Sequence, residues 1–160
     1  MIDGDSVAAA FVEIGVTHVV WIPDSELGTW EAALVAEKRL SLIRVCREGE
    51  AIAIAAGLLL GGKQPIVLMQ CTGFFEAGDA FRNFIHDLKL PLFFVVGVRS
   101  YYAYQQGTSA DSCPVYTEPV LGAWKVPYTL LDKQHEATDL AEAYRRAQTE
   151  QRAGVVLLAE

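Results

Sequence analysis

Hydrophobic residues follow two alternating patterns along the chain. One places apolar residues three and four positions apart, as in amphipathic helices; the first case has apolar residues at 7, 10, 11 and 14, after Asp5 or Ser6 as a candidate N-cap. The other is a short, continuously apolar run, typical of a buried strand. The predicted strands cover residues 18–22, 42–46, 65–70, 91–98, 128–131 and 155–158. The predicted helices lie near 6–14, 27–35, 48–60, 76–88, 118–124 and 140–147.

Regular alternation of strands and helices predicts an α/β fold of one domain over residues 1–160. Right-handed crossovers make the sheet mainly parallel, and strands without polar alternation need a helical layer on both faces. We therefore expect a three-layer αβα structure around a six-stranded sheet. Ligands bind such sheets beyond the carboxyl ends of the strands, so the segments to search are 23–26, 47–50, 70–73 and the polar, tyrosine-rich loop predicted from Arg99 to residue 114.

Composition narrows the functional classes. The chain is 52% hydrophobic and 21% charged, which excludes a disordered protein, and its net charge of −7 disfavours a nucleic-acid binder. No signal-peptide pattern is visible, and the longest apolar run, 51–60, is too short to span a membrane. The three cysteines lack metal-ligand spacing and are interpreted as free thiols of a cytoplasmic protein, with no metal site on this chain. The hydrophobic fraction is high for a domain that stands alone, and the reason for this excess has to be found in the structure or in its partners.

Common phosphate and nucleophile motifs are missing. The sequence has no GxGxxG after the first strand, no P-loop and no GxSxG, which disfavours dinucleotide enzymes, P-loop enzymes and α/β-hydrolases. Carboxylates stand out instead: Glu48 and Glu50 open a helix that is apolar on nearly every side. Glu48 is either a helix-start carboxylate or a buried acid at a ligand. Asp24 and Ser25 form a good turn and N-cap after Pro23.

Three segments together resemble one family. They are IPDS at 22–25, REGEA at 47–51 and MQCTG at 69–73. They resemble, in order and at comparable spacing, the pyrimidine-binding (PYR) domain of thiamine diphosphate-dependent decarboxylases. The sulfopyruvate and phosphonopyruvate decarboxylases are the most similar group, and REGEA is the most specific of the three segments.

The resemblance implies a mechanism and the residues that carry it. In that family a glutamate hydrogen-bonds a ring nitrogen of the cofactor's aminopyrimidine and so promotes loss of the proton from the thiazolium carbon. Glu48 matches this catalytic and cofactor-binding residue. Gln70, Thr72 and Gly73 match positions that line the pyrimidine ring. Glu50 is expected to cap the helix or to pair with Arg47.

Substrate-facing residues are also implied. Asp24 and Ser25 match the turn that approaches the substrate, and Arg99 is placed to meet an anionic group. The sequence departs from the family pattern at Cys71 and Thr72, where Asn-Ser is usual, and throughout the loop of Tyr101, Tyr102 and Tyr104. That loop is either a packing cluster or a binding surface. The resemblance thus implies a 2-oxo acid substrate and leaves room for one larger or less polar than sulfopyruvate.

The resemblance also implies a partner. Family members bind Mg²⁺ and the diphosphate through a G-D-G motif on a second domain, whereas residues 3–5 of this chain, Asp-Gly-Asp, lie at the start of the first helix. We expect a subunit completed by a separately encoded β subunit that carries Mg²⁺, in a hetero-oligomer of α2β2 or higher order. Alternatives are a carboligase of the acetolactate-synthase type, a non-catalytic binding or regulatory module, and a flavodoxin-like nucleotide binder.

Overall fold

A computed structural model describes residues 2–160. Within them, one parallel sheet is formed in the order β2-β1-β3-β4-β6-β5. The strands are β1 (His18–Trp21), β2 (Ser41–Arg44), β3 (Pro65–Gln70), β4 (Phe93–Val98), β5 (Tyr128–Leu131) and β6 (Gly154–Ala159). The predicted fold class, a three-layer α/β structure with a six-stranded sheet, is confirmed.

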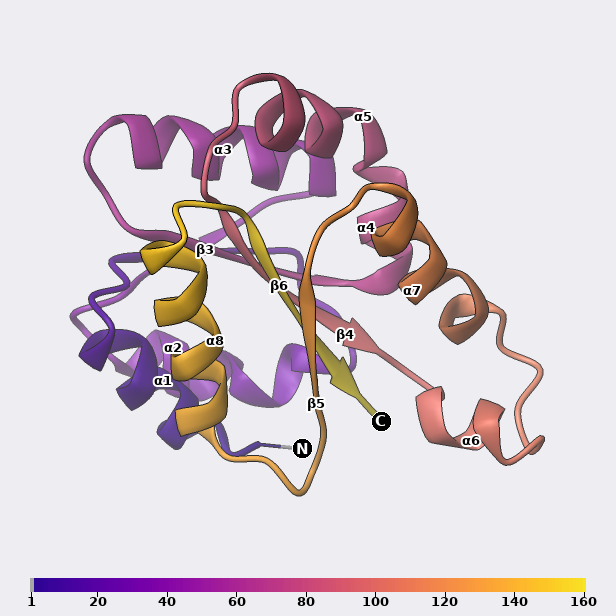
Figure 1. Ribbon diagram of the computed structural model, residues 1–160. Coiled ribbons are helices and arrows are strands. Elements are labelled where there is room, and N and C mark those ends of the chain that lie inside the picture. The colour runs from indigo at the N-terminus through magenta and orange to yellow at the C-terminus, as the bar shows by residue number, and fades with distance from the viewer. Residues whose placement is uncertain (1) are drawn as a thin grey trace.

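Helices cover both faces of this sheet (Figure 1). One layer holds α1 (Gly4–Glu13), the 3₁₀ turn η1 (Leu27–Trp30), α2 (Glu31–Ala36) and α8 (Ala137–Thr149). The other layer holds α3 (Glu48–Leu60), α4 (Cys71–Glu76), α5 (Gly78–Phe81), the π-helical turn η2 (Arg82–Asp87) and α7 (Cys113–Ala123). The short helix α6 (Tyr101–Gln105) follows β4.

Each central strand contributes to two cores. In β3, Ile66 and Leu68 pack against the first layer, whereas Val67 and Met69 pack against the second. All four are fully buried, which explains why the strands read as continuous apolar runs. Helix α3 is less enclosed than its composition predicts, because Leu60 near its end is 72% exposed.

The chain reverses its direction of winding between β1 and β3. From β1 it crosses through η1 and α2 to β2, and from there through α3, on the opposite face, to β3 beside β1. The loops that follow β1 and β3 therefore leave the sheet toward opposite faces. In α/β proteins, ligands bind at such a switch point, beyond the carboxyl ends of the strands.

Four local predictions differ from the structure. The helix after β3 begins at Cys71, so Thr72 and Gly73 lie in its first turn rather than in a loop. The helix predicted near 76–88 is divided into α4, α5 and η2, and the loop predicted at 99–114 contains α6 and the start of α7. The N-cap of α1 is Asp3, whose carboxylate accepts a hydrogen bond from the Ser6 N–H at 2.9 Å.

Long-range hydrogen bonds explain why α6 forms in a segment without helical periodicity. The Tyr102 hydroxyl donates to Asp132 at 2.6 Å, and the Tyr101 hydroxyl donates to Glu118 at 3.3 Å. Two of the three tyrosines of this segment therefore bind within the chain, whereas Tyr104 is 41% exposed.

Across residues 2–160, every helix falls short of the length and apolarity needed to cross a membrane. The same residues bring together no group of three His, Cys, Asp or Glu side chains that could hold a metal ion.

Candidate active site

The turn after β1 is built around Asp24. Its Oδ1 accepts hydrogen bonds from the backbone N–H groups of Glu26 and Leu27 at 2.8 and 2.7 Å, and these bonds direct the chain into η1. The Trp21 indole N–H approaches Oδ2 at 3.5 Å. Burial raises the pKa of the Asp24 carboxyl. Asp24 thus serves as the turn cap that its sequence context predicts, at the carboxyl edge of the sheet.

Glu26 is a residue of this edge that the sequence analysis missed. Its side chain lies at the switch point and is only 3% exposed. Ser25 donates from its hydroxyl to Oε1 at 3.1 Å, and the Gln70 side-chain amide donates to Oε2. A glutamate just after a turn motif looks like an ordinary surface residue. The available signal was Gly97 inside an otherwise bulky β4, because a Cβ at that position would lie 3.0 Å from the Cβ of Glu26.

The end of β3 continues this network. Gln70 is the last residue of β3 and is half-buried. The Thr72 hydroxyl donates to Gln70 Oε1 at 2.7 Å, so the Gln70 amide is bound at both of its ends. The structure therefore brings Ser25 together with Gln70 and Thr72, and it does so through Glu26.

Glu48 lies against Gly73. Glu48 is the first residue of α3, and Gly73 lies in the first turn of α4. A Cβ built at position 73 would overlap Oε1, Cγ and Cδ of Glu48. The Glu48 side chain is therefore packed directly over the Gly73 backbone, and any larger residue at 73 would displace it. The juxtaposition links REGEA to MQCTG, two of the segments that carry the family resemblance.

Glu50 was expected to cap α3 or to pair with Arg47. Its carboxylate accepts a hydrogen bond from the backbone N–H of Cys46 at 3.4 Å, a group that lies before α3 and its N-cap residue Arg47. The expected alternative, an Arg47–Glu50 pair, is wrong: Arg47 binds Glu76 at the end of α4. Arg47 thereby ties the start of α3 to α4, on the same two helices that hold Glu48 and Gly73.

Arg99 is engaged within the chain. Its Nε donates to Asp111 Oδ2 at 2.8 Å, and this partner raises the pKa of the guanidinium. The other Asp111 oxygen accepts from the backbone N–H of Cys113 at 3.0 Å, so the pair closes the segment between β4 and α7. An anionic substrate group would have to compete with Asp111 for Arg99. Other acids lie at the same edge. Burial raises the pKa of the Glu160 carboxyl, and the negative charges of Glu26 and Asp24 raise it further.

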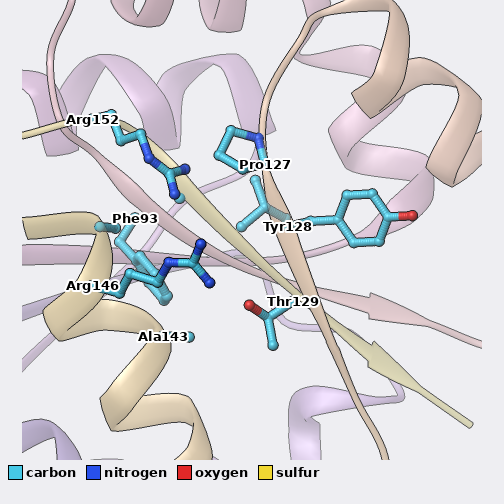
Figure 2. A pocket seen from close by; sticks show the side chains of 10 residues that line it. Phe93, Pro127, Tyr128, Thr129, Ala143, Arg146 and Arg152 are labelled. Atoms are coloured by element: carbon cyan, nitrogen blue, oxygen red, sulfur yellow. The ribbon is translucent and has the colours of Figure 1, made fainter. Parts of the chain in front are cut away.

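A separate small cleft lies at the opposite end of the sheet. It has a volume of about 80 Å³ and is lined at the amino ends of β4, β5 and β6 by residues that include Phe93, Tyr128 and Gly154. Figure 2 shows Arg146 and Arg152 directed into this cleft. Both guanidinium groups bind Glu150, whose single negative charge offsets one of the two positive charges. The cleft lies away from the predicted site residues, which gather at the carboxyl ends.

Comparisons with known proteins identify relatives in sequence and in fold. No protein-family model matches the chain. The chain is 30% identical over 95 residues to the sulfopyruvate decarboxylase subunit alpha of Methanococcus maripaludis, an alignment that spans 59% of this chain and 57% of that protein. It is 29% identical over 91 residues to the phosphonopyruvate decarboxylase of Streptomyces hygroscopicus, spanning 57% of this chain and 23% of that protein. The chain thus matches little more than half of the first relative and about a quarter of the second.

Solved structures share the fold over nearly the whole chain. The benzoylformate decarboxylase of Polynucleobacter necessarius superposes with a TM-score of 0.72 at 19% identity, covering 99% of this chain and 30% of that one. A putative thiamin diphosphate-dependent enzyme from Mycobacterium smegmatis superposes with a TM-score of 0.71 at 17% identity, with the same coverage of both chains.

The fold is therefore that of the PYR-type domain found in thiamine diphosphate-dependent enzymes. Within that class, the sequence is similar to the sulfopyruvate and phosphonopyruvate decarboxylases. The predicted resemblance is confirmed.

Proposed function

We propose that residues 1–160 form the pyrimidine-binding domain of a thiamine diphosphate-dependent 2-oxo acid decarboxylase. The observation that carries this proposal is the Glu48 carboxylate seated on Gly73, where a Cβ would displace it. The polar groups fit an aminopyrimidine, which presents ring nitrogens and an exocyclic amine: the Glu48 carboxylate lies against Gly73, the neighbour of Thr72, whose hydroxyl binds the Gln70 amide.

Each residue then has a defined task. Glu48 holds a proton at a ring nitrogen of the pyrimidine, and its seat on Gly73 fixes the direction of its carboxylate. Gln70, Thr72 and Gly73 line the ring. When bound, the cofactor supplies the electron sink for loss of carbon dioxide from a 2-oxo acid. Asp24 and Ser25 face the substrate.

We further propose that the site is completed by a separate β subunit that holds Mg²⁺ and the diphosphate. Thr72 and Ser25 are exposed at the carboxyl edge of the single chain, and Leu60, at the far end of α3 from Glu48, is 72% exposed. A partner that covers the carboxyl edge would exclude water from the acid at Glu48, and one that extends along α3 would also bury the apolar surface of Leu60. The relative from M. maripaludis is itself named as a subunit alpha. Three free cysteines fit a cytoplasmic enzyme.

The test is decarboxylation by a reconstituted pair. The chain is combined with a partner that carries a G-D-G motif, together with thiamine diphosphate and Mg²⁺, and release of carbon dioxide is measured over a panel of 2-oxo acids. We expect turnover by the pair and none by the isolated chain. Robust turnover by the chain alone would contradict the two-subunit proposal, and no turnover by any pairing would contradict the decarboxylase.

Product analysis separates the enzymatic alternative. A free aldehyde supports simple decarboxylation, whereas a hydroxyketone indicates a carboligase of the acetolactate-synthase type.

A further inference from the structure

We propose that Glu26 is a positioning residue of the pyrimidine site: its carboxylate sets the orientation of the Gln70 amide and, through it, of the Thr72 hydroxyl. The role toward a ligand rests on the proposed function. The orientation of Gln70 is a property of this chain alone and is testable without any ligand.

The burial of Glu26 needs a reason. A carboxylate loses its hydration on burial, and that loss is costly unless hydrogen bonds replace the water. In the described chain its hydrogen-bond partners are the neutral donors Ser25 and Gln70. The charge of Arg99 acts on Glu26 only through space, because the Arg99 guanidinium is hydrogen-bonded to Asp111. Such a group at the carboxyl edge of a sheet, beside predicted site residues, is more costly to stability than an apolar residue of similar size.

Space for Glu26 is provided by another strand. Gly97 lies in β4 directly opposite Gln70 in the ladder, and a Cβ there would press on the Glu26 Cβ at 3.0 Å. A glycine in the middle of a buried strand loses packing and backbone entropy. Gly97 therefore leaves the space that the Glu26 side chain occupies. Each of the two residues lowers the stability of this part of the fold.

The chemistry of the carboxylate explains what this pair achieves. An ionised carboxylate only accepts hydrogen bonds, so the Gln70 NH₂ group must face Glu26 and the Gln70 carbonyl oxygen must face the other way. That oxygen then accepts the Thr72 hydroxyl proton, which leaves the Thr72 oxygen with its lone pairs free to accept from a ligand donor. Without the carboxylate the Gln70 amide can rotate by half a turn, and the direction of the Thr72 hydroxyl is no longer determined.

This series of hydrogen bonds ends next to Glu48, the proposed catalytic acid. Thr72 is followed by Gly73, on which the Glu48 side chain lies. Glu26 reaches neither Glu48 nor the proposed ligand directly in this arrangement. It acts through Gln70, which is why its role is positioning rather than catalytic.

The first measurement is solution NMR of the ¹⁵N-labelled full chain, observing the side-chain NH₂ pair of Gln70. In Glu26→Leu we expect the Gln70 amide protons to exchange with water about tenfold faster, the size expected from the loss of one buried hydrogen bond. Glu26→Gln retains an acceptor oxygen and should restore slow exchange. Ser25→Ala removes only the other partner of Glu26, and Glu142→Gln changes an exposed acid on α8; both should leave Gln70 as in the wild type.

A second variant covers the case in which Glu26→Leu does not fold. Gly97→Ala keeps the carboxylate but displaces it by the Cβ contact, and the same faster exchange is expected. If Gln70 exchanges at the wild-type rate in a folded Glu26→Leu or in Gly97→Ala, the positioning role is overturned.

The second measurement titrates thiamine diphosphate into the same samples and follows the Gly73 amide. Apparent affinity should fall roughly three- to tenfold in Glu26→Leu and recover in Glu26→Gln. Altered Gln70 exchange with unchanged affinity would overturn the link between Glu26 and the ligand. Absence of any saturable shift in the wild type would count against the proposed function, while Gln70 exchange would still decide the orientation claim.

Discussion

Two groups of side chains in the structure contain carboxylates, and they differ in the partners that these carboxylates bind. The first group, which we call the site cluster, consists of Asp24, Glu26, Glu48, Gln70, Thr72 and Gly73. Its buried acid is held by neutral donors, a hydroxyl and an amide, and Asp24 is held by two backbone N–H groups. Glu48 rests on a glycine backbone.

The second group, the tyrosine clasp, consists of Tyr101, Tyr102, Glu118, Tyr128 and Asp132. Both acids bind phenol hydroxyls tightly: Tyr102 donates to Asp132 and Tyr128 donates to Glu118, each at 2.6 Å. These bonds connect α6 to the residue that follows β5, and they connect β5 to α7. The phenol bond and its other partners lower the pKa of Asp132 to about 2.

The difference indicates different tasks for the two groups. In the clasp, each acid is satisfied by a partner from another element, as expected of a structural connection. The site cluster keeps acids where desolvation opposes their charge, which costs stability, and proteins tolerate such costs mainly at functional sites. The predictions below test this contrast.

The largest effect is expected from Glu48→Gln in the reconstituted enzyme. Loss of one proton-transfer group should lower kcat by on the order of 10²- to 10⁴-fold, because such groups contribute rates of that size. Glu118→Gln removes an acid of the clasp and serves as the matched control, with a rate close to that of the wild type. Equal rates for the two variants would remove the distinction between site cluster and clasp.

The second largest effect is expected from a larger residue at position 73, where the Glu48 side chain now lies. Gly73→Ala should lower the free energy of unfolding by about 1–3 kcal/mol, the usual cost of overpacking a site. Gly57→Ala, in the exposed middle of α3 where a Cβ meets no neighbour, should raise the free energy of unfolding by about 0.5–1 kcal/mol. Urea denaturation measures both, and a neutral Gly73→Ala would show that Glu48 is not seated as described.

At high pH the tyrosine clasp should lose its hydrogen bonds, whereas the site cluster should not change. Hydrogen bonds to acids raise the pKa of Tyr102 and Tyr128 to about 12, above the usual value of about 10. Their stabilisation is therefore complete below about pH 10 and is lost as pH rises through about 12. Hydrogen exchange should show α6 becoming less protected across that interval, without a change at Gly73. Tyr102→Phe should make α6 less protected already at neutral pH; unchanged protection in that variant would mean that the clasp does not hold α6.

The smallest effect concerns thiol reactivity. Burial raises the pKa of Cys71 to about 12, and burial also raises the pKa of Cys113, its neighbour from α7. Cys46 is exposed. Iodoacetamide should therefore modify Cys46 alone in the folded chain, as followed by mass spectrometry, because alkylation needs an accessible thiolate. Rapid modification of Cys71 would show that the start of α4, beside Gly73, is open to solvent.

Local patterns predicted much of the fold. All six strands lie within two residues of their expected positions, and α3 begins at Glu48 as expected, because apolar runs and helix-start acids act over a few residues. The juxtaposition of Glu48 and Gly73 was implied by a family resemblance, not by spacing. It depends on the packing of α3 on α4, which no local pattern encodes.

What the sequence did not predict depends on contacts between distant residues. Helix α6 is held by the bond from Tyr102 to Asp132, thirty positions away. Glu26 is recognisable as a buried acid only once β1, β3 and β4 lie side by side, because its partner Gln70 and its neighbour Gly97 come from the other two strands.

The central claim is that the site cluster, and not the clasp, receives the pyrimidine of thiamine diphosphate. The direct test is titration of the ligand, to millimolar concentration, into the ¹³C,¹⁵N-labelled chain while NMR follows the carboxyl carbons of Glu48 and Asp132 and the amide of Gly73. The account predicts saturable shifts at Glu48 and Gly73 and none at Asp132. Shifts at Asp132 with Glu48 and Gly73 unmoved would contradict it.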